Sequence, residues 1–219
     1  KQFALLSKYG VQMIESQAKP TIGWDDDTND VIIHWEKYRQ EMEGIRDFGL
    51  NKKPIPYVGA FYDTPKKIKD KIDEKMPGAT QSQKDNKFAA AYGRLLREAV
   101  SIARNDYQTD IVFYLIDEAF LDPDNTRDRE RLIEQATQLK ALLPSAKTWG
   151  TISFEHWWGY YNDYKQYFNY LTFDARVDNW KTKFATPDAF KAALEQDPQY
   201  KHVGQMYFNA VKPADIAGH

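Results

Sequence analysis

Residues 111–125, with the sequence IVFYLIDEAFLDPDN, decide the fold class of this chain. A strand on a protein surface alternates polar and apolar residues, whereas residues 111–116 are largely apolar without alternation. Such a run is typical of a strand whose two faces are both covered, as in a parallel sheet. Asp117 and Glu118 follow it directly. The sequence therefore predicts a buried strand, Ile111 to Ile116, that carries two carboxylates at its carboxyl end.

The same order, an amphipathic helix and then a short apolar strand, recurs along the chain. Residues 86–104 and 127–143 both have apolar residues at helical spacing, and the latter precede an expected strand at 147–153. This alternation predicts an α/β fold with a parallel sheet and helical crossovers. The other expected helices are 1–10, 34–49 and 186–196, a short helix and loop are expected within 64–83, and the other expected strands are 11–15, 54–63, 170–175 and 202–210.

Two parallel architectures compete for this pattern. An open, doubly wound sheet of the dinucleotide-binding kind needs a glycine-rich phosphate fingerprint after a strand, and no strand here is followed by one. The alternative is a (β/α)8 TIM-type barrel, which needs eight strands. We expect residues 1–219 to form a single, incomplete barrel domain with about six strands, as a fragment of a longer chain.

The composition of the chain limits the classes of function that it can have. The 30 basic and 32 acidic residues are interspersed and leave a formal net charge of −2, so charge does not indicate a nucleic-acid partner. No apolar stretch approaches the roughly 20 residues that cross a bilayer. There is no cysteine, and aromatic residues make up 15% of the chain, with a cluster between Phe154 and Trp180.

In a barrel, chemistry sits at the carboxyl ends of the strands. Carboxylates beside aromatic side chains are what glycosidic bond cleavage needs, because one acid protonates the leaving oxygen and aromatic faces cover sugar rings. Asp117 and Glu118 are therefore the expected catalytic residues. The expected substrate-binding residues, at or near other strand ends, are Glu15, Tyr62, Asp63, Glu155, His156, Trp157, Trp158, Asp174 and Asn209.

Each candidate also has a structural interpretation. An acid after a strand often caps a turn or helix, about half of the aromatic cluster should be core, and His156 is more often a hydrogen-bonded loop histidine than a catalytic residue.

The acidic run from Gly23 to Asp30 lacks the glycine and terminal glutamate of a calcium-binding EF-hand loop, so a solvated loop with a helix cap is expected. The remaining histidines have no ligand spacing. We expect no metal site and no cofactor.

The segment FYLIDEAF, followed by a loop, a helix that ends in LLPSAK and a strand TWGTIS, resembles glycoside hydrolase family 123 and related proteins. The resemblance covers residues 86–153, and Ala119 stands where the family motif usually has proline. It implies a (β/α)8 barrel that cleaves N-acetylhexosaminides by substrate-assisted retention. It also implies that Glu118 is the general acid/base and that Asp117 orients the 2-acetamido group.

Two other functions stay open. A barrel of this lineage could bind glycans, or build a surface assembly, without turnover. A sugar-phosphate lyase or aldolase would want a strand-end lysine for a Schiff base, and the expected strands end in acids, asparagine or serine. The expected partners are a glycan and further domains of the same polypeptide, with neither nucleic acid nor a membrane span, and the expected location is secreted or cell-surface.

Overall fold

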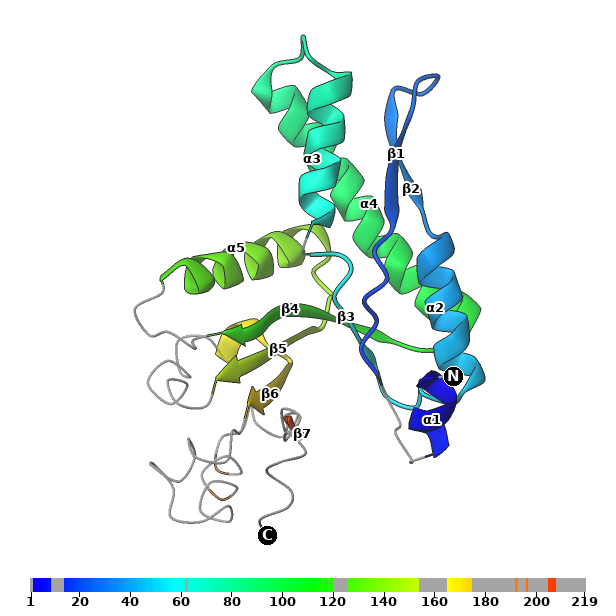
Figure 1. Cartoon of the computed structure of the whole chain (residues 1–219). Coiled ribbons are helices and arrows are strands. Elements are labelled where there is room, and N and C mark those ends of the chain that lie inside the picture. The colour runs from blue at the N-terminus through cyan, green and yellow to red at the C-terminus, as the bar shows by residue number, and fades with distance from the viewer. Residues whose placement is uncertain are drawn as a thin grey trace, which may run out of the picture. The chain divides into compact units, whose positions relative to one another are not determined.

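The computed structural model describes residues 2–8, 14–61, 63–119, 126–153, 165–174, 192, 196 and 205–207. Its helices and strands alternate over much of the chain (Figure 1). The helices are α1 (Gln2–Lys8), α2 (Glu36–Asp47), α3 (Thr64–Lys75), α4 (Gln81–Tyr107), α5 (Thr126–Leu142) and a 3-10 turn, η1 (Lys165–Tyr167). The strands are β1 (Thr21–Asp25), β2 (Asp30–His34), β3 (Ile55–Tyr57), β4 (Ile111–Ala119), β5 (Thr148–Ser153), β6 (Tyr170–Asp174) and β7 (Gln205–Tyr207).

The chain divides into two compact units. The first contains residues 1–114 and 137–146, and the second contains residues 115–136 and 147–219. Strand β4 begins in the first unit and ends in the second.

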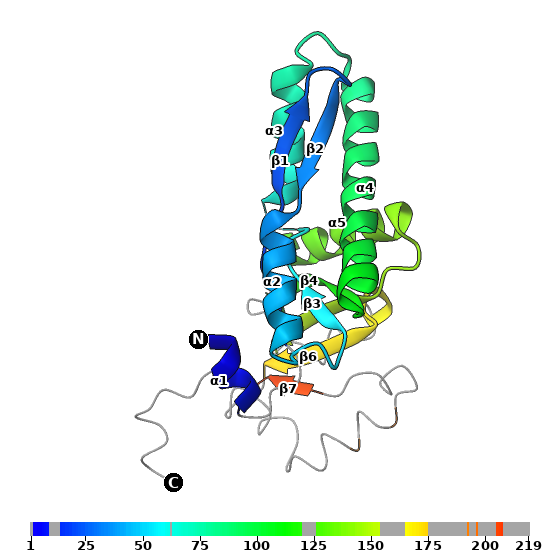
Figure 2. The same ribbon diagram turned by 90° about the vertical axis from the view of Figure 1, so that its right-hand side faces the viewer.

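In the first unit, α2, α3 and α4 pack with the hairpin of β1 and β2 (Figures 1 and 2). The apolar spacing that predicted α2 is confirmed, because Tyr38, Met42 and Ile45 form its buried stripe. Gly49 follows the helix with a φ of 66°, a left-handed conformation that glycine adopts without strain. At α4, Thr80 and Gln83 form a capping box that satisfies free backbone donors of the first turn.

The hairpin corrects the expectation for the acidic run. Residues 23–25 and Asp30 pair in antiparallel strands, with Asp25 opposite Asp30 at the end of the ladder, whereas residues 26–29 form an exposed turn, as the expected solvated loop would. Asp25 Oδ1 accepts hydrogen bonds from the backbone N–H groups of Asp27 and Thr28, so local side-chain bonding closes the turn. The acids are turn formers, while Val31 on the returning strand is buried and Ile32 next to it is half-buried.

Asp30 joins the hairpin to α4 through an ion-pair cluster. Its carboxylate lies 2.8 Å from Arg94 Nη1 and 3.0 Å from Lys87 Nζ, and Arg94 also donates to the carbonyl of Val31. Burial raises the pKa of Asp30, but the hydrogen bonds from Arg94 and Lys87 outweigh it and lower the pKa from 3.8 to about 2.

Replacing this carboxylate should therefore have a pH-dependent cost. Because the folded-state pKa is depressed, the stabilisation is complete above about pH 4 and is lost as the pH falls toward about 2. We expect Asp30→Asn to lower the free energy of unfolding by about 1 kcal/mol at pH 7, since the group is partly exposed, and by almost nothing at pH 2. Urea titrations across this range measure it, with Asp27→Asn as the control. A cost that does not change with pH would contradict it.

The second sheet is parallel. The described strands run in the order β3-β4-β5-β6-β7, with Ile55 opposite Ile111 where β3 meets β4 and Ser153 opposite Asp174 where β5 meets β6. At the other end of β5, Thr148 and Asn169 exchange hydrogen bonds that hold the two strand starts together. A Cβ at Gly150 would lie 2.4 Å from the Phe168 ring, so that ring packs where only glycine leaves space.

The expected (β/α)8 barrel is wrong. The described strands form a two-stranded antiparallel sheet and a five-stranded sheet, neither of which is an eight-stranded ring, and the protein has a small α/β fold. The alternation of helices and strands correctly indicated parallel pairing between neighbours. Closure into a barrel depends instead on strand number, tilt and stagger, which a pattern of apolar residues does not encode.

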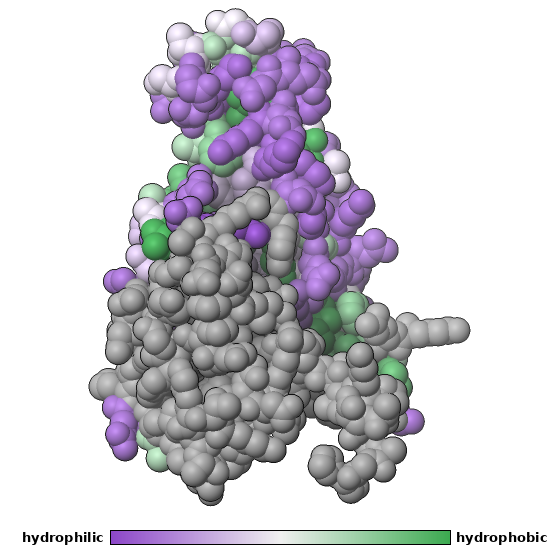
Figure 3. Space-filling view, turned by 60° about the vertical axis from the view of Figure 1, so that its left-hand side comes forward, coloured by the Kyte–Doolittle hydropathy of each residue, from purple (hydrophilic) through white to green (hydrophobic). Residues whose placement is uncertain are grey.

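Much of the aromatic content of the first unit is core. Ring centroids are 4.8 Å apart for Tyr38 and Tyr57, 6.2 Å for Tyr57 and Phe113, and 5.8 Å for Phe61 and Phe113. All four side chains are almost completely buried. These rings connect α2, β3 and β4, so here aromatic residues serve packing. By contrast, the face of the first unit that is turned toward the viewer in Figure 3 is mainly hydrophilic.

Two buried tyrosines differ in how their hydroxyl groups are satisfied. Tyr92 donates to the backbone carbonyl of Ala60 at 3.1 Å, whereas the Tyr57 hydroxyl has no hydrogen-bond partner among the described residues. Burial raises the pKa of both phenols, so both stay protonated. A buried polar group without a partner costs stability, and a satisfied one contributes to it.

The same substitution should therefore act with opposite sign at these two positions. We expect Tyr57→Phe to raise the free energy of unfolding by about 1 kcal/mol and Tyr92→Phe to lower it by about 1 kcal/mol. Thermal and urea unfolding of the two variants measure the difference. A loss of stability in Tyr57→Phe would show that its hydroxyl is satisfied after all.

Candidate functional site

The acid doublet lies at the carboxyl end of an inner strand. Strand β4 has β3 on one side and β5 on the other in the strand order. Its first residues, including Val112, Phe113 and Leu115, are buried and anchor the strand in the core. The strand continues through Asp117 and Glu118 to Ala119, three residues further than predicted. The apolar pattern stops at Ile116, but backbone pairing does not need apolar side chains, so it continues.

Neighbouring strands end at the same edge. Ser153, the last residue of β5, is opposite Asp174, the last residue of β6, and Asp174 is opposite Tyr207, the last residue of β7. Because β5, β6 and β7 are parallel, their carboxyl ends lie together, and in open α/β sheets ligands bind at this edge. The predicted position of Asp174 at a strand end is confirmed. Tyr207 was not predicted as a strand-end residue, because the expected strand continued to residue 210.

Asp63 does not belong to this edge. Strand β3 ends at Tyr57, and Asp63 is the residue that precedes helix α3. It is exposed and pairs with Lys19 at 2.9 Å, and this hydrogen bond lowers the pKa of its carboxyl. The apolar residues from Val58 to Phe61 suggested a longer strand, but they are buried in a turn that the Phe61 N–H to Val58 carbonyl bond closes.

Glu15 adjoins the end of β3 in the first unit. The next residue, Ser16, bridges to Tyr57 in parallel, and its hydroxyl donates to Glu41 at 2.6 Å. Glu41 also accepts from the backbone N–H of Ala18 at 2.9 Å. Glu15 itself is half-buried and accepts from the Gln17 side chain at 2.8 Å. The structure thus gives Glu41 a positioning role for this segment that its place in the α2 sequence pattern did not indicate.

Six of the predicted substrate-binding residues lie outside the described residues. They are Tyr62, Glu155, His156, Trp157, Trp158 and Asn209. The predicted helix at 186–196 also falls outside them, apart from residues 192 and 196, as do most of the predicted strand at 11–15 and the ends of the strand at 202–210.

The described residues bear on metal binding and on the membrane. In this part of the chain, no group of three or more histidine, aspartate and glutamate side chains could hold a metal ion. None of the described helices combines the length and the apolar character needed to cross a bilayer.

By its fold, the chain is a small α/β protein. The strand-end acids place a candidate site at the carboxyl edge of its parallel sheet. Comparison with protein-family models, with curated proteins and with solved structures found no match.

Proposed function

We propose that this chain is a glycoside hydrolase-like domain that acts on glycans containing N-acetylhexosamine. The observation that carries the proposal is the position of Asp117 and Glu118 at the carboxyl end of an inner parallel strand, β4. Asp174 and Tyr207 end two further strands of the same sheet. The resemblance of residues 86–153 to glycoside hydrolase family 123 supports the same chemistry.

The proposed reaction has two steps and needs one acid and one orienting carboxylate. In the first step, Glu118 gives its proton to the glycosidic oxygen while the carbonyl oxygen of the 2-acetamido group bonds to the anomeric carbon and the glycosidic bond breaks. Asp117 orients the acetamido N–H and stabilises the charge that develops on that group. In the second step, Glu118 takes a proton from water, whose oxygen bonds to the anomeric carbon and releases the acetamido group.

A second candidate function is glycan binding without turnover. The specific observation in its favour is Ala119, which stands directly after the doublet at the place where the resembling motif usually has proline. Proline holds φ near −65°, and alanine does not, so the path of the chain after the acids is less constrained. A domain with a displaced loop could keep the sugar-binding surface and lose the geometry for proton transfer.

A panel of aryl glycosides tests the proposal. We expect release of 4-nitrophenol from the N-acetyl-β-glucosaminide or the N-acetyl-β-galactosaminide, and no release from the matching glucoside and galactoside, which lack the acetamido nucleophile. Turnover of all four sugars would contradict substrate assistance. No turnover of any sugar, combined with saturable binding of an N-acetylhexosamine oligosaccharide, would replace the hydrolase by the binding function.

A further inference from the structure

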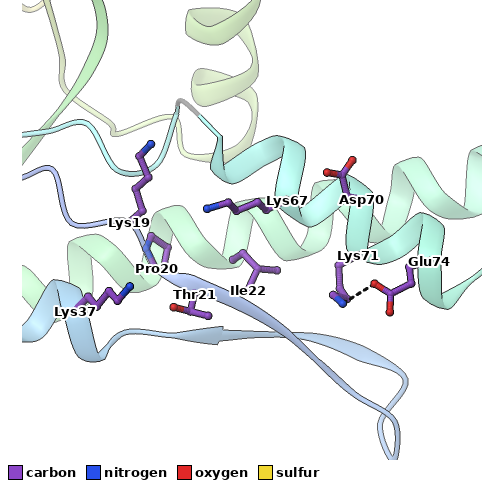
Figure 4. Close-up of a pocket in the computed structure, with 9 residues that line it drawn as sticks. All are labelled: Lys19, Pro20, Thr21, Ile22, Lys37, Lys67, Asp70, Lys71 and Glu74. Carbon is purple, nitrogen blue, oxygen red and sulfur yellow. Dashed lines mark hydrogen bonds and ion pairs between the residues drawn. The ribbon is translucent and has the colours of Figure 1, made fainter.

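We propose that a cavity in the first unit binds the phosphate or sulfate group of a small organic ester. The cavity has a volume of about 550 Å³, within the range of small-molecule sites. It lies between the first residues of β1, the first turn of α2 and one face of α3 (Figure 4). Its residues belong to the first unit, so the proposal does not depend on the glycosidase function.

The lining of this cavity carries an excess of positive charge. Four lysines and two acids line it, which gives 4 − 2 = +2, in a chain whose formal net charge is −2. Both acids already have cationic partners. Asp70 lies 2.6 Å from Lys66 Nζ, and Glu74 lies 2.6 Å from Lys71 Nζ. The acids therefore do not neutralise the other lysines of the cavity.

Lys37 and Lys67 are the two cavity lysines without a direct hydrogen-bonded or ion-paired acid among the described residues, although the charge of Asp63 also acts on Lys67 at longer range. Neither side chain forms a hydrogen bond or an ion pair with any residue in the described part of the chain, whereas Lys19, also at the cavity, pairs with Asp63 at 2.9 Å. In Figure 4, Lys67 extends from α3 toward Lys19, and Lys37 extends from α2 toward Pro20. These two ammonium groups thus approach one volume from two different elements.

The backbone adds to the positive potential at these lysines. Lys67 lies in the first turn of α3, which contains no acidic residue although Asp63 precedes it, and Lys37 lies next to Glu36 in the first turn of α2. The amino end of a helix carries partial positive charge, so a lysine there is unfavourable by a few tenths of a kcal/mol. A bound anion would relieve this repulsion, chiefly at α3, whose first turn has no acid.

The shape and chemistry of the cavity indicate the class of ligand. Lysine ammonium groups bind phosphate-type oxyanions as point charges with rotatable donors, and they do not demand the planar geometry that arginine does. Pro20 and Ile22 provide an apolar surface beside these charges, and Thr21 provides a hydroxyl group. A bare ion would leave that apolar surface unused. We therefore infer an ester of a small carbon skeleton, such as a sugar monophosphate or monosulfate.

Amide-resolved NMR titrations of the full chain test this inference. The probes are glucose 6-phosphate, glucose 6-sulfate and neutral glucose at one ionic strength. We expect saturable shifts of the Thr21, Ile22 and Lys67 amides with at least one ester and none with glucose. The ester that binds more tightly shows whether the cavity prefers a phosphate or a sulfate group. Equal shifts with glucose, or shifts that grow linearly without saturation, would overturn the proposal.

Charge-removing variants supply the second readout. Lys67→Met and Lys37→Met keep the length and helix propensity of the side chain, and each should weaken ester binding about fivefold. Lys53→Met, an exposed lysine that does not line the cavity, should leave binding unchanged. Circular dichroism confirms that each variant is folded. Wild-type affinity in both cavity variants would overturn the proposal, and it would leave the aryl glycoside result untouched.

Discussion

Glu118→Gln should lower kcat/KM for 4-nitrophenyl N-acetyl-β-glucosaminide by about 10²- to 10⁴-fold, the usual contribution of a general acid. Glutamine keeps the size and hydrogen-bonding shape of the side chain but cannot give up a proton to the leaving oxygen. The loss should fall mainly on kcat, because binding of the sugar does not need that proton. Initial rates of nitrophenol release over a range of substrate concentrations measure both parameters.

A merely structural role for Glu118 can be separated from the catalytic one by changing the leaving group. A 2,4-dinitrophenyl leaving group departs as a stable anion and needs little protonation, so the variant should lose much less activity on that substrate. A structural defect would reduce the activity on both substrates equally. Glu134→Gln, on the exposed face of α5, is the matched control and should be fully active. Unchanged hydrolysis by Glu118→Gln would refute the assignment of the acid.

Phe113→Ala should lower the free energy of unfolding by about 3–5 kcal/mol, the largest stability effect that we expect in this chain. Phe113 is fully buried at the start of β4, where its ring contacts those of Tyr57 and Phe61. Removing it leaves a cavity that the rigid strand pair cannot close, so both transfer energy and packing are lost. Urea denaturation followed by tryptophan fluorescence measures the change in the free energy of unfolding.

Phe48→Ala provides the comparison for this core position. Phe48 follows α2, is 39% exposed and packs against the Phe3 ring in a tilted arrangement, with 6.3 Å between centroids. Its loss removes less buried surface and leaves no enclosed cavity, so we expect a cost of about 1–2 kcal/mol, clearly below that of Phe113→Ala. If the two substitutions cost the same, the ring cluster around Phe113 would not be the stabilising core that its burial indicates.

The two halves of the candidate site differ in how far the sequence predicts them. Asp117 and Glu118 are recognisable because an unbroken apolar run ends directly before them, and Asp174 because it closes the short run from Tyr170. Asp63 misled the prediction, since Val58 to Phe61 are as apolar as a strand but are buried in a turn. Lys37 and Lys67 gave no signal, because each is an ordinary exposed lysine on an amphipathic helix until the fold brings them to one cavity.

Local patterns alone determined the helices α2, α4 and α5, the starts of β3, β4, β5 and β6 to within one residue, and the parallel direction of the sheet. Helical spacing and uninterrupted apolar runs report which face of each element is buried, and this information is local. The tertiary structure decided three other features: the hairpin made by the acidic run, the open sheet in place of a barrel, and the lysine-lined cavity. Each depends on contacts between residues far apart in the chain, such as Asp30 with Arg94 or Lys19 with Asp63, whose free energies a local pattern does not contain.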